Sequence, residues 1–182
     1  MTTIIDLVGA TIFGGLILLI IFNLNVYSSQ VKHSSDSELV LQQNAKTLAE
    51  IINSDLRKIG FNYDSTAIIT AESKKISFYA DIDSNGVVDV VTYYLSDSTK
   101  ASGTSNPKDK VLIRVVNNDS SSGPSLGITD IQFSYKNSIK VNTAAKDSIK
   151  YIEAEIWLET PELINDKYSF TYWELTINPR NI

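Results

Sequence analysis

The segment from Thr2 to Val26 is the longest apolar run of the chain. From Leu7 to Phe22 every residue is apolar, Gly or Thr, and Ile4 and Val26 extend the run on either side. As a helix rising about 1.5 Å per residue, the run of about 23 residues is roughly 34 Å long, enough to cross the hydrocarbon core of a bilayer. The pattern therefore predicts a transmembrane helix over residues 1–27.

A cleaved secretory signal is the other common origin of such a run. It would begin with basic residues and end in a site of small residues. No Lys or Arg precedes Lys32, and no A-x-A-type site follows the run. The nearest positive charges, at Lys32 and beyond, all lie on its C-terminal side, so the positive-inside rule indicates no orientation. We therefore expect a membrane anchor whose orientation the charges leave open.

The next segment combines a polar stretch with a helical repeat. Residues 28–38 are polar, and apolar residues then recur at steps of three and four: Leu41, Ala45, Leu48, Ile52, Leu56 and Ile59. This period, stopped by Gly60, predicts an amphipathic helix over residues 28–60. The helix either continues the membrane helix or breaks from it near Ser34–Ser37. The only histidine, His33, lies in the polar stretch, and we expect it to be solvated and without function.

Beyond Gly60 the sequence indicates strands and turns. Runs rich in β-branched and aromatic residues predict strands at 74–81, 87–95, 110–116, 128–136, 149–159 and 168–177. In one run, apolar and mainly acidic positions alternate: Ile152, Ala154, Ile156 and Leu158 against Glu153, Glu155, Trp157 and Glu159. This alternation is typical of an antiparallel sheet with one covered face. The polar stretches 96–110 and 117–127 are expected to be loops.

These elements predict an α+β fold: a long N-terminal transmembrane and amphipathic helix packed on an antiparallel β-sheet. The length of 182 residues allows one domain besides the anchor, so we expect residues 61–182 to be the sheet domain and 28–182 to fold together. The net charge of -5, with Lys and Arg scattered, argues against direct nucleic-acid binding.

Catalytic chemistry has little support in the composition. The absence of cysteine excludes disulfides, thiolate metal sites and a cysteine nucleophile, and the sequence has neither a G-x-S-x-G motif nor a phosphate-binding loop. The glutamates of run 149–159 are more simply the wet face of a strand. We expect the protein not to be an enzyme.

Asp6 is the one charge in the apolar run. A carboxylate at the centre of a membrane helix costs about 2.5–3.5 kcal/mol on insertion scales, so such a group usually has a partner. The alternative is that Asp6, close to the end, simply reaches headgroups and water. Gly9, Gly14 and Gly15 leave small surfaces where another helix can approach, although glycine is also generally common in membrane helices.

The stretch DIDSNGVVD indicates a calcium loop. Asp81, Asp83, Asn85 and Asp89 stand at its first, third, fifth and ninth places, and the Val87 carbonyl stands seventh. Calcium takes about six to eight oxygen ligands, which this spacing can supply. The flanking strands exclude an EF-hand. The alternative is a plain hairpin turn with solvated aspartates. Calcium is the only cofactor that the sequence suggests.

Four stretches carry a family resemblance when they are read together. Without Met1 the opening TTIIDLVGA is similar to FTLIELLVA, with Asp6 at the acidic fifth place. Residues 41–61 end in a motif similar to DLRRAGY, matched at Asp55, Leu56, Arg57, Gly60 and Phe61. The hairpin 76–95 and the ending WELTINPRN (173–181) complete the pattern. Their order and spacing resemble type IV pilin-like proteins, specifically minor pilins and minor pseudopilins of the PilW and general-secretion J types.

The resemblance implies a structural role, as a minor subunit of a type IV pilus or a type II secretion-like filament. Its partners would be other pilin or pseudopilin subunits and the lipid of the bacterial inner membrane. The domain would lie in the periplasm, or on a cell-surface filament after assembly. In such filaments the apolar helices form the core, and the carboxylate at the place of Asp6 pairs with the N-terminal ammonium of a neighbouring subunit.

Two features differ from the family pattern. Its members are made with a short basic leader that a prepilin peptidase removes before methylating the new N-terminus, and the sequence shows no such leader. Asp6 also replaces the more usual Glu. We expect either that Met1 stands in for the leader or that the chain is not processed in this way.

A second class of function follows from Trp157. This indole shares a strand face with Glu153, Glu155 and Glu159 and is a candidate exposed contact residue. The alternative function is a membrane-anchored, calcium-dependent module for adhesion or ligand binding outside the cytoplasm. It predicts a chain that never enters a filament and that tolerates a change at Asp6.

Overall fold

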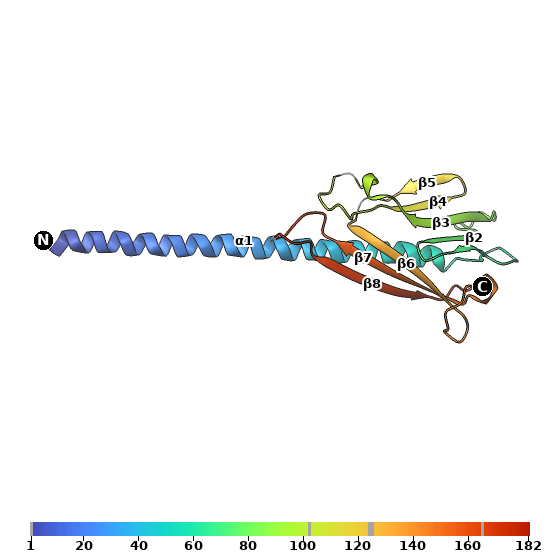
Figure 1. Cartoon of the computed structure of the whole chain (residues 1–182). Coiled ribbons are helices and arrows are strands. Elements are labelled where there is room, and N and C mark those ends of the chain that lie inside the picture. The colour runs from blue at the N-terminus through green and yellow to red at the C-terminus, as the bar shows by residue number, and fades with distance from the viewer. Residues whose placement is uncertain (1, 102, 124–125, 165) are drawn as a thin grey trace. The chain divides into compact units, whose positions relative to one another are not determined.

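The computed structural model describes residues 2–101, 103–123, 126–164 and 166–182. Two compact units divide the chain, the first ending at Leu39 and the second comprising Val40–Ile182. Helix α1 (Thr2–Leu56) forms the first unit and continues into the second (Figure 1). The helix has no break near Ser34–Ser37. There the Ser37 hydroxyl donates to the His33 carbonyl at 2.9 Å, which satisfies a polar side chain within the helix.

Between Leu7 and Phe22 α1 is apolar on every side, and the large apolar side chains from Ile4 to Val26 are exposed. A helix that is apolar all round is stable only where it is covered by protein or lipid. Its length and composition suit a membrane crossing, and they equally suit a signal sequence.

The second unit contains two antiparallel sheets where the sequence predicted one. A five-stranded sheet has the order β1 (Ile68–Ala71), β2 (Lys75–Ala80), β3 (Asp89–Leu95), β4 (Leu112–Val116), β5 (Asp119–Ser122). A three-stranded sheet has the order β6 (Ile128–Lys136), β7 (Tyr151–Glu159), β8 (Phe170–Ile177). Short 3-10 helices lie at Ser98–Lys100 and Lys146–Ser148. In Figure 1, β2 to β5 of the first sheet form one group of strands, and β6, β7 and β8 of the second sheet form another.

Two strands lie outside the predicted ones. The four residues of β1 are too short a run to indicate a strand. Strand β5 reads DSSS, is exposed throughout and was predicted as part of a loop, which was wrong. Pairing with β4 from Ile113↔Ser122 to Val116↔Asp119 gives β5 its extended conformation, and no apolar pattern marks such an edge strand in the sequence.

One hydrophobic core joins the C-terminal part of α1 to both sheets. The helix contributes Leu41, Ala45, Leu48, Ala49, Ile52 and Leu56. All but Ala49 were predicted from the helical period, and the last predicted residue, Ile59, is buried just after the helix. On β7, Ile152, Ala154, Ile156 and Leu158 are all fully buried, which confirms the predicted alternation. The helix ends at Leu56, slightly earlier than predicted, and turns with Lys58 N–H to Asp55 C=O and Ile59 N–H to Leu56 C=O bonds lead to Gly60.

Candidate functional site

Asp6, the candidate assembly residue, lies in the second turn of α1, in the first unit. Its side chain is exposed. Three glycines follow it, and each has open space where a Cβ atom would lie: Gly9, Gly14 and Gly15. This segment of the helix therefore has a carboxylate followed by small residues that allow close helix packing. Both are accessible to another helix.

The Asp-rich loop between β2 and β3, together with Asp89 at the start of β3, brings three carboxylates close to one another. Ligand atoms of Asp81, Asp83 and Asp89 all lie within 4.8 Å of one another. Asp81 is fully buried and Asp89 nearly so, whereas Asp83 is exposed. Of the other two predicted ligands, Asn85 accepts the Val87 N–H with its side-chain oxygen at 2.7 Å, and Val87 is exposed in the turn. The loop therefore presents a group of carboxylates, with the Asn85 oxygen already bonded within the turn.

The carboxylate of Asp81 organises the loop. It accepts Asn85 N–H at 3.0 Å, Gly86 N–H at 2.9 Å and the Asn62 side-chain amide at 2.8 Å. Burial alone would raise its pKa, but the bond from Asn62 and those from the backbone amides hold the pKa of Asp81 below its ordinary value. Asp81 therefore remains a carboxylate at neutral pH.

The donor set is chemically suited to a hard cation. A carboxylate has about four acceptor positions. Asp83 and Asp89 each accept two hydrogen bonds and so retain free acceptor positions for a cation, whereas the Asp81 carboxylate is more fully engaged within the loop. Asn117, which donates to Asp89 at 2.8 Å, comes from beyond β4 and was not predicted from the sequence. The same contacts also close the loop as a turn without an ion, the alternative noted from the sequence.

A buried polar network connects α1 to the five-stranded sheet. It was not predicted from the sequence. The Tyr93 hydroxyl (β3) donates to Asp55 (α1) at 2.5 Å, and Arg114 Nε (β4) donates to the same carboxylate oxygen at 2.6 Å. Burial, the Asp55 charge and this bond raise the pKa of Tyr93 far above its ordinary value. Burial alone would lower the pKa of Arg114, but its bond to Asp55 and the Asp55 charge raise it. Tyr93 thus stays a neutral donor and Arg114 a cation, so this cluster is a structural ion pair.

Trp157 is half-buried on the outward face of β7. Its ring lies 5.4 Å from that of Tyr172, the directly opposite residue on β8. Together with Phe170, which is 77 % exposed, and Thr129, Trp157 lines an open hollow of about 300 Å³. The sequence predicted Trp157 as a surface residue. It indicated that most of the other strand aromatics belong to the core, but Phe170 and Tyr172 on β8 are exposed.

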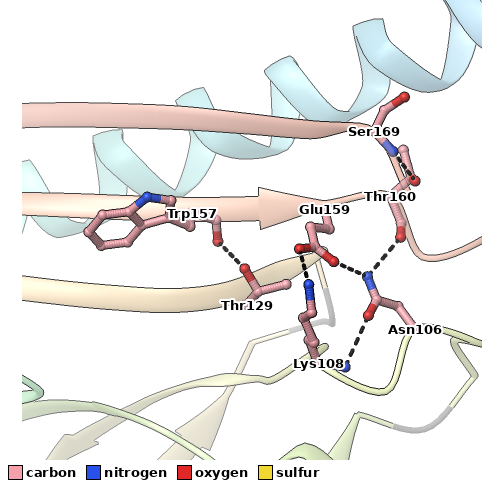
Figure 2. Close-up of polar contacts among 7 residues, drawn as sticks. All are labelled: Asn106, Lys108, Thr129, Trp157, Glu159, Thr160 and Ser169. Carbon is pink, nitrogen blue, oxygen red and sulfur yellow. Dashed lines mark hydrogen bonds and ion pairs between the residues drawn. The ribbon is translucent and has the colours of Figure 1, made fainter. Parts of the chain in front are cut away.

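Figure 2 shows the polar contacts of Glu159, one of the residues that line the hollow. Glu159 lies between Lys108, whose ammonium is 2.8 Å from one carboxylate oxygen, and Asn106, whose amide donates to the other at 2.9 Å. Asn106 also donates to the Thr160 carbonyl at 3.2 Å. These bonds hold the loop after β3 against the end of β7. Burial alone would raise the pKa of Glu159, but Lys108 and Asn106 hold it below its ordinary value.

Comparison with known proteins gives no family. No protein-family model, no curated protein and no solved structure matches the chain. The structure itself defines the protein at a coarser level, as an α+β protein with one long, apolar N-terminal helix and two antiparallel sheets.

Proposed function

We propose that the chain is a structural minor subunit of a type IV pilus or a type II secretion-like filament, which assembles through its N-terminal helix. The observation that supports this proposal is one continuous helix. Its N-terminal part is exposed and largely apolar, and its C-terminal part belongs to the core of a folded domain. A subunit of this kind lies in the bacterial inner membrane, with its domain in the periplasm, before assembly. Its partners are other pilin-like subunits.

Asp6 supports this proposal by its chemistry. A carboxylate surrounded by packed apolar helices is costly unless an opposite charge meets it, and the N-terminal ammonium of a neighbouring subunit is such a charge. Asp6 would thereby set the axial register between subunits. The exposed Asp6 side chain is available for that contact.

The Asp6→Ala variant tests the proposal. We expect its amount in sheared surface filaments to fall at least about tenfold, because breaking a buried ion pair costs about 3–5 kcal/mol. Its amount in the membrane should stay unchanged. Immunoblots of filament and membrane fractions measure both, and mass spectrometry of the same fractions identifies the N-terminus.

Asp36→Ala is the matched control, since Asp36 is an exposed carboxylate on the same helix outside the apolar run. It should enter filaments normally. Wild-type protein that is confined to membranes, or equal filament levels for both variants, would favour the membrane-anchored adhesion or ligand-binding module. The observation that favours that second function is the aromatic hollow at Trp157.

We also propose that the Asp-rich loop binds calcium and that the ion rigidifies the β2–β3 hairpin. A ligand at about 100 times its Kd stabilises a protein by about 2.7 kcal/mol, so saturating calcium should raise the Tm of the full chain by about 5–10 °C over chelator. Differential scanning calorimetry in detergent measures this change.

Asp83→Asn should abolish the calcium response while moving the calcium-free Tm little, because Asp83 is exposed. Asp119→Asn, on the exposed edge strand β5, should keep the full response. Identical wild-type melting curves in calcium and in chelator would show that the loop is a plain hairpin turn.

A further inference from the structure

The outward face of the three-stranded sheet is polar, aromatic and uncovered. Pairing places Trp157 opposite Tyr172, Glu155 opposite Glu174 and Glu159 opposite Phe170 along β7 and β8. We call these six residues the β7–β8 face. All of its β8 residues are exposed, and its β7 residues are partly so.

Three carboxylates on or beside this face already have a lysine. Lys108 lies 2.8 Å from Glu159, Lys136 lies 2.5 Å from Glu153, and Lys74 lies 2.6 Å from Asp130. The bond to Lys136 holds the pKa of Glu153 below its ordinary value, against the effect of partial burial. A cation beside each carboxylate is therefore the local pattern on this sheet.

Glu155 and Glu174 depart from that pattern. Within the described residues neither has an ion pair, although they face each other directly across β7 and β8. Among the described residues, the hydrogen bond that reaches this pair is the one that the Tyr172 hydroxyl donates to Glu174 at 3.1 Å. Like charges directly opposite on a sheet are destabilising. The chain thus keeps a like-charge pair at the centre of an open face while it neutralises the surrounding carboxylates.

The rings beside this pair suit a cation. The Trp157 and Tyr172 rings lie one pair further along the same face, with centroids 5.4 Å apart, and indole and phenol faces attract ammonium and guanidinium groups. Burial and the bond to Glu174 raise the pKa of Tyr172, and the charges of Glu155, Glu174 and Glu153 add to that rise. The carboxylates and the aromatic ring faces therefore both favour a cationic ligand group.

The free edge of β8 favours a peptide segment as the ligand that bears this cationic group. Among the described strands β8 pairs only with β7, so its other edge has no strand partner. An extended segment can pair with such an edge through its backbone while alternate side chains reach over the face.

We propose that the β7–β8 face docks an extended segment of a partner protein whose arginine or lysine side chain lies between Glu155 and Glu174 and against the Trp157 and Tyr172 rings. The inference goes beyond the filament proposal and does not depend on it. Charge complementarity selects a basic partner, since the two unpaired carboxylates would repel an acidic one.

The test uses the full chain in zwitterionic detergent and calorimetric titration. The probe is an acetylated, amidated pentapeptide with arginine at its second and fourth positions and threonine elsewhere. The comparison peptide replaces both arginines by citrulline, which is neutral and nearly isosteric. We expect saturable binding of the arginine peptide that weakens with salt, and at least tenfold weaker binding of the citrulline peptide.

Two variants and one control locate the site. The double variant Glu155→Gln with Glu174→Gln should weaken binding at least tenfold, and Trp157→Ala about threefold or more by loss of the cation–π contact. Glu153→Gln should change affinity less than twofold, because Lys136 already occupies that carboxylate.

A stability measurement separates this role from a structural one. Because the opposed charges repel, the double variant should melt about 1–3 °C higher than the wild type. Equal binding of both peptides, equal loss in the double variant and Glu153→Gln, or a lower Tm for the double variant would overturn the proposal. Binding of neutral oligosaccharides at Trp157 without binding of the arginine peptide would overturn it too.

Discussion

Replacement of Asp55 by Ala is expected to lower the free energy of unfolding of the Val40–Ile182 unit by about 3–5 kcal/mol. Asp55 is 9 % exposed, and one oxygen of its carboxylate accepts bonds from Tyr93 and Arg114. Without it, a partly buried guanidinium is left without its counter-charge and a buried hydroxyl without its acceptor, and both losses are costly. Denaturant unfolding of the full chain, followed by circular dichroism, measures the change.

Tyr93→Phe is the matched comparison, because it removes one hydroxyl from the same network and leaves the ion pair. It should cost about 1 kcal/mol. Asp119→Ala, on an exposed edge strand, should cost under about 0.5 kcal/mol. If Asp55→Ala proved as mild as Asp119→Ala, the network would not be what holds α1 to the five-stranded sheet.

The second large effect is expected for Gly60→Ala, at about 2–5 kcal/mol of unfolding free energy. Gly60 follows the end of α1 with φ of 78°, a conformation that disfavours any side chain. A Cβ there would lie 2.5 Å from the Asn181 carbonyl oxygen, so the C-terminal segment would have to move. Thermal unfolding with and without the substitution measures the loss.

Gly103→Ala separates the two causes. Gly103 also has positive φ, 95°, but a Cβ there would meet nothing within 4 Å. Gly103→Ala should therefore lower the free energy of unfolding only by the backbone strain of a positive φ, about 1–2 kcal/mol. Equal losses at both positions would mean that the contact with Asn181 contributes nothing.

The pattern of apolar and polar residues was most informative for elements that bury one face. The helical period from Leu41 to Leu56 and the alternation on β7 both correspond to the observed core, because each period assigns side chains to a face without reference to the rest of the fold. The same local logic placed Asp81, Asp83 and Asp89 in one loop, since they are close in sequence. Their gathering within 4.8 Å follows from a short hairpin.

Contacts between distant segments were not predictable in the same way. Strand β5 has no apolar residue and exists through its pairing with β4. Arg114 reaches Asp55 from a strand remote in sequence, and Asn117 likewise reaches Asp89. Such pairs depend on strand register, which a one-residue shift would change entirely.

The sequence by itself determined a long apolar N-terminal helix, an amphipathic continuation and a strand-rich remainder, because hydrophobic periodicity is a local property. Only the tertiary structure decided that the strands form two sheets, that Asp55 is an internal ion-pair partner, and that Glu155 faces Glu174 beside two aromatic rings. The physical reason is that cross-strand pairing and burial bring together residues whose spacing along the chain carries no signal.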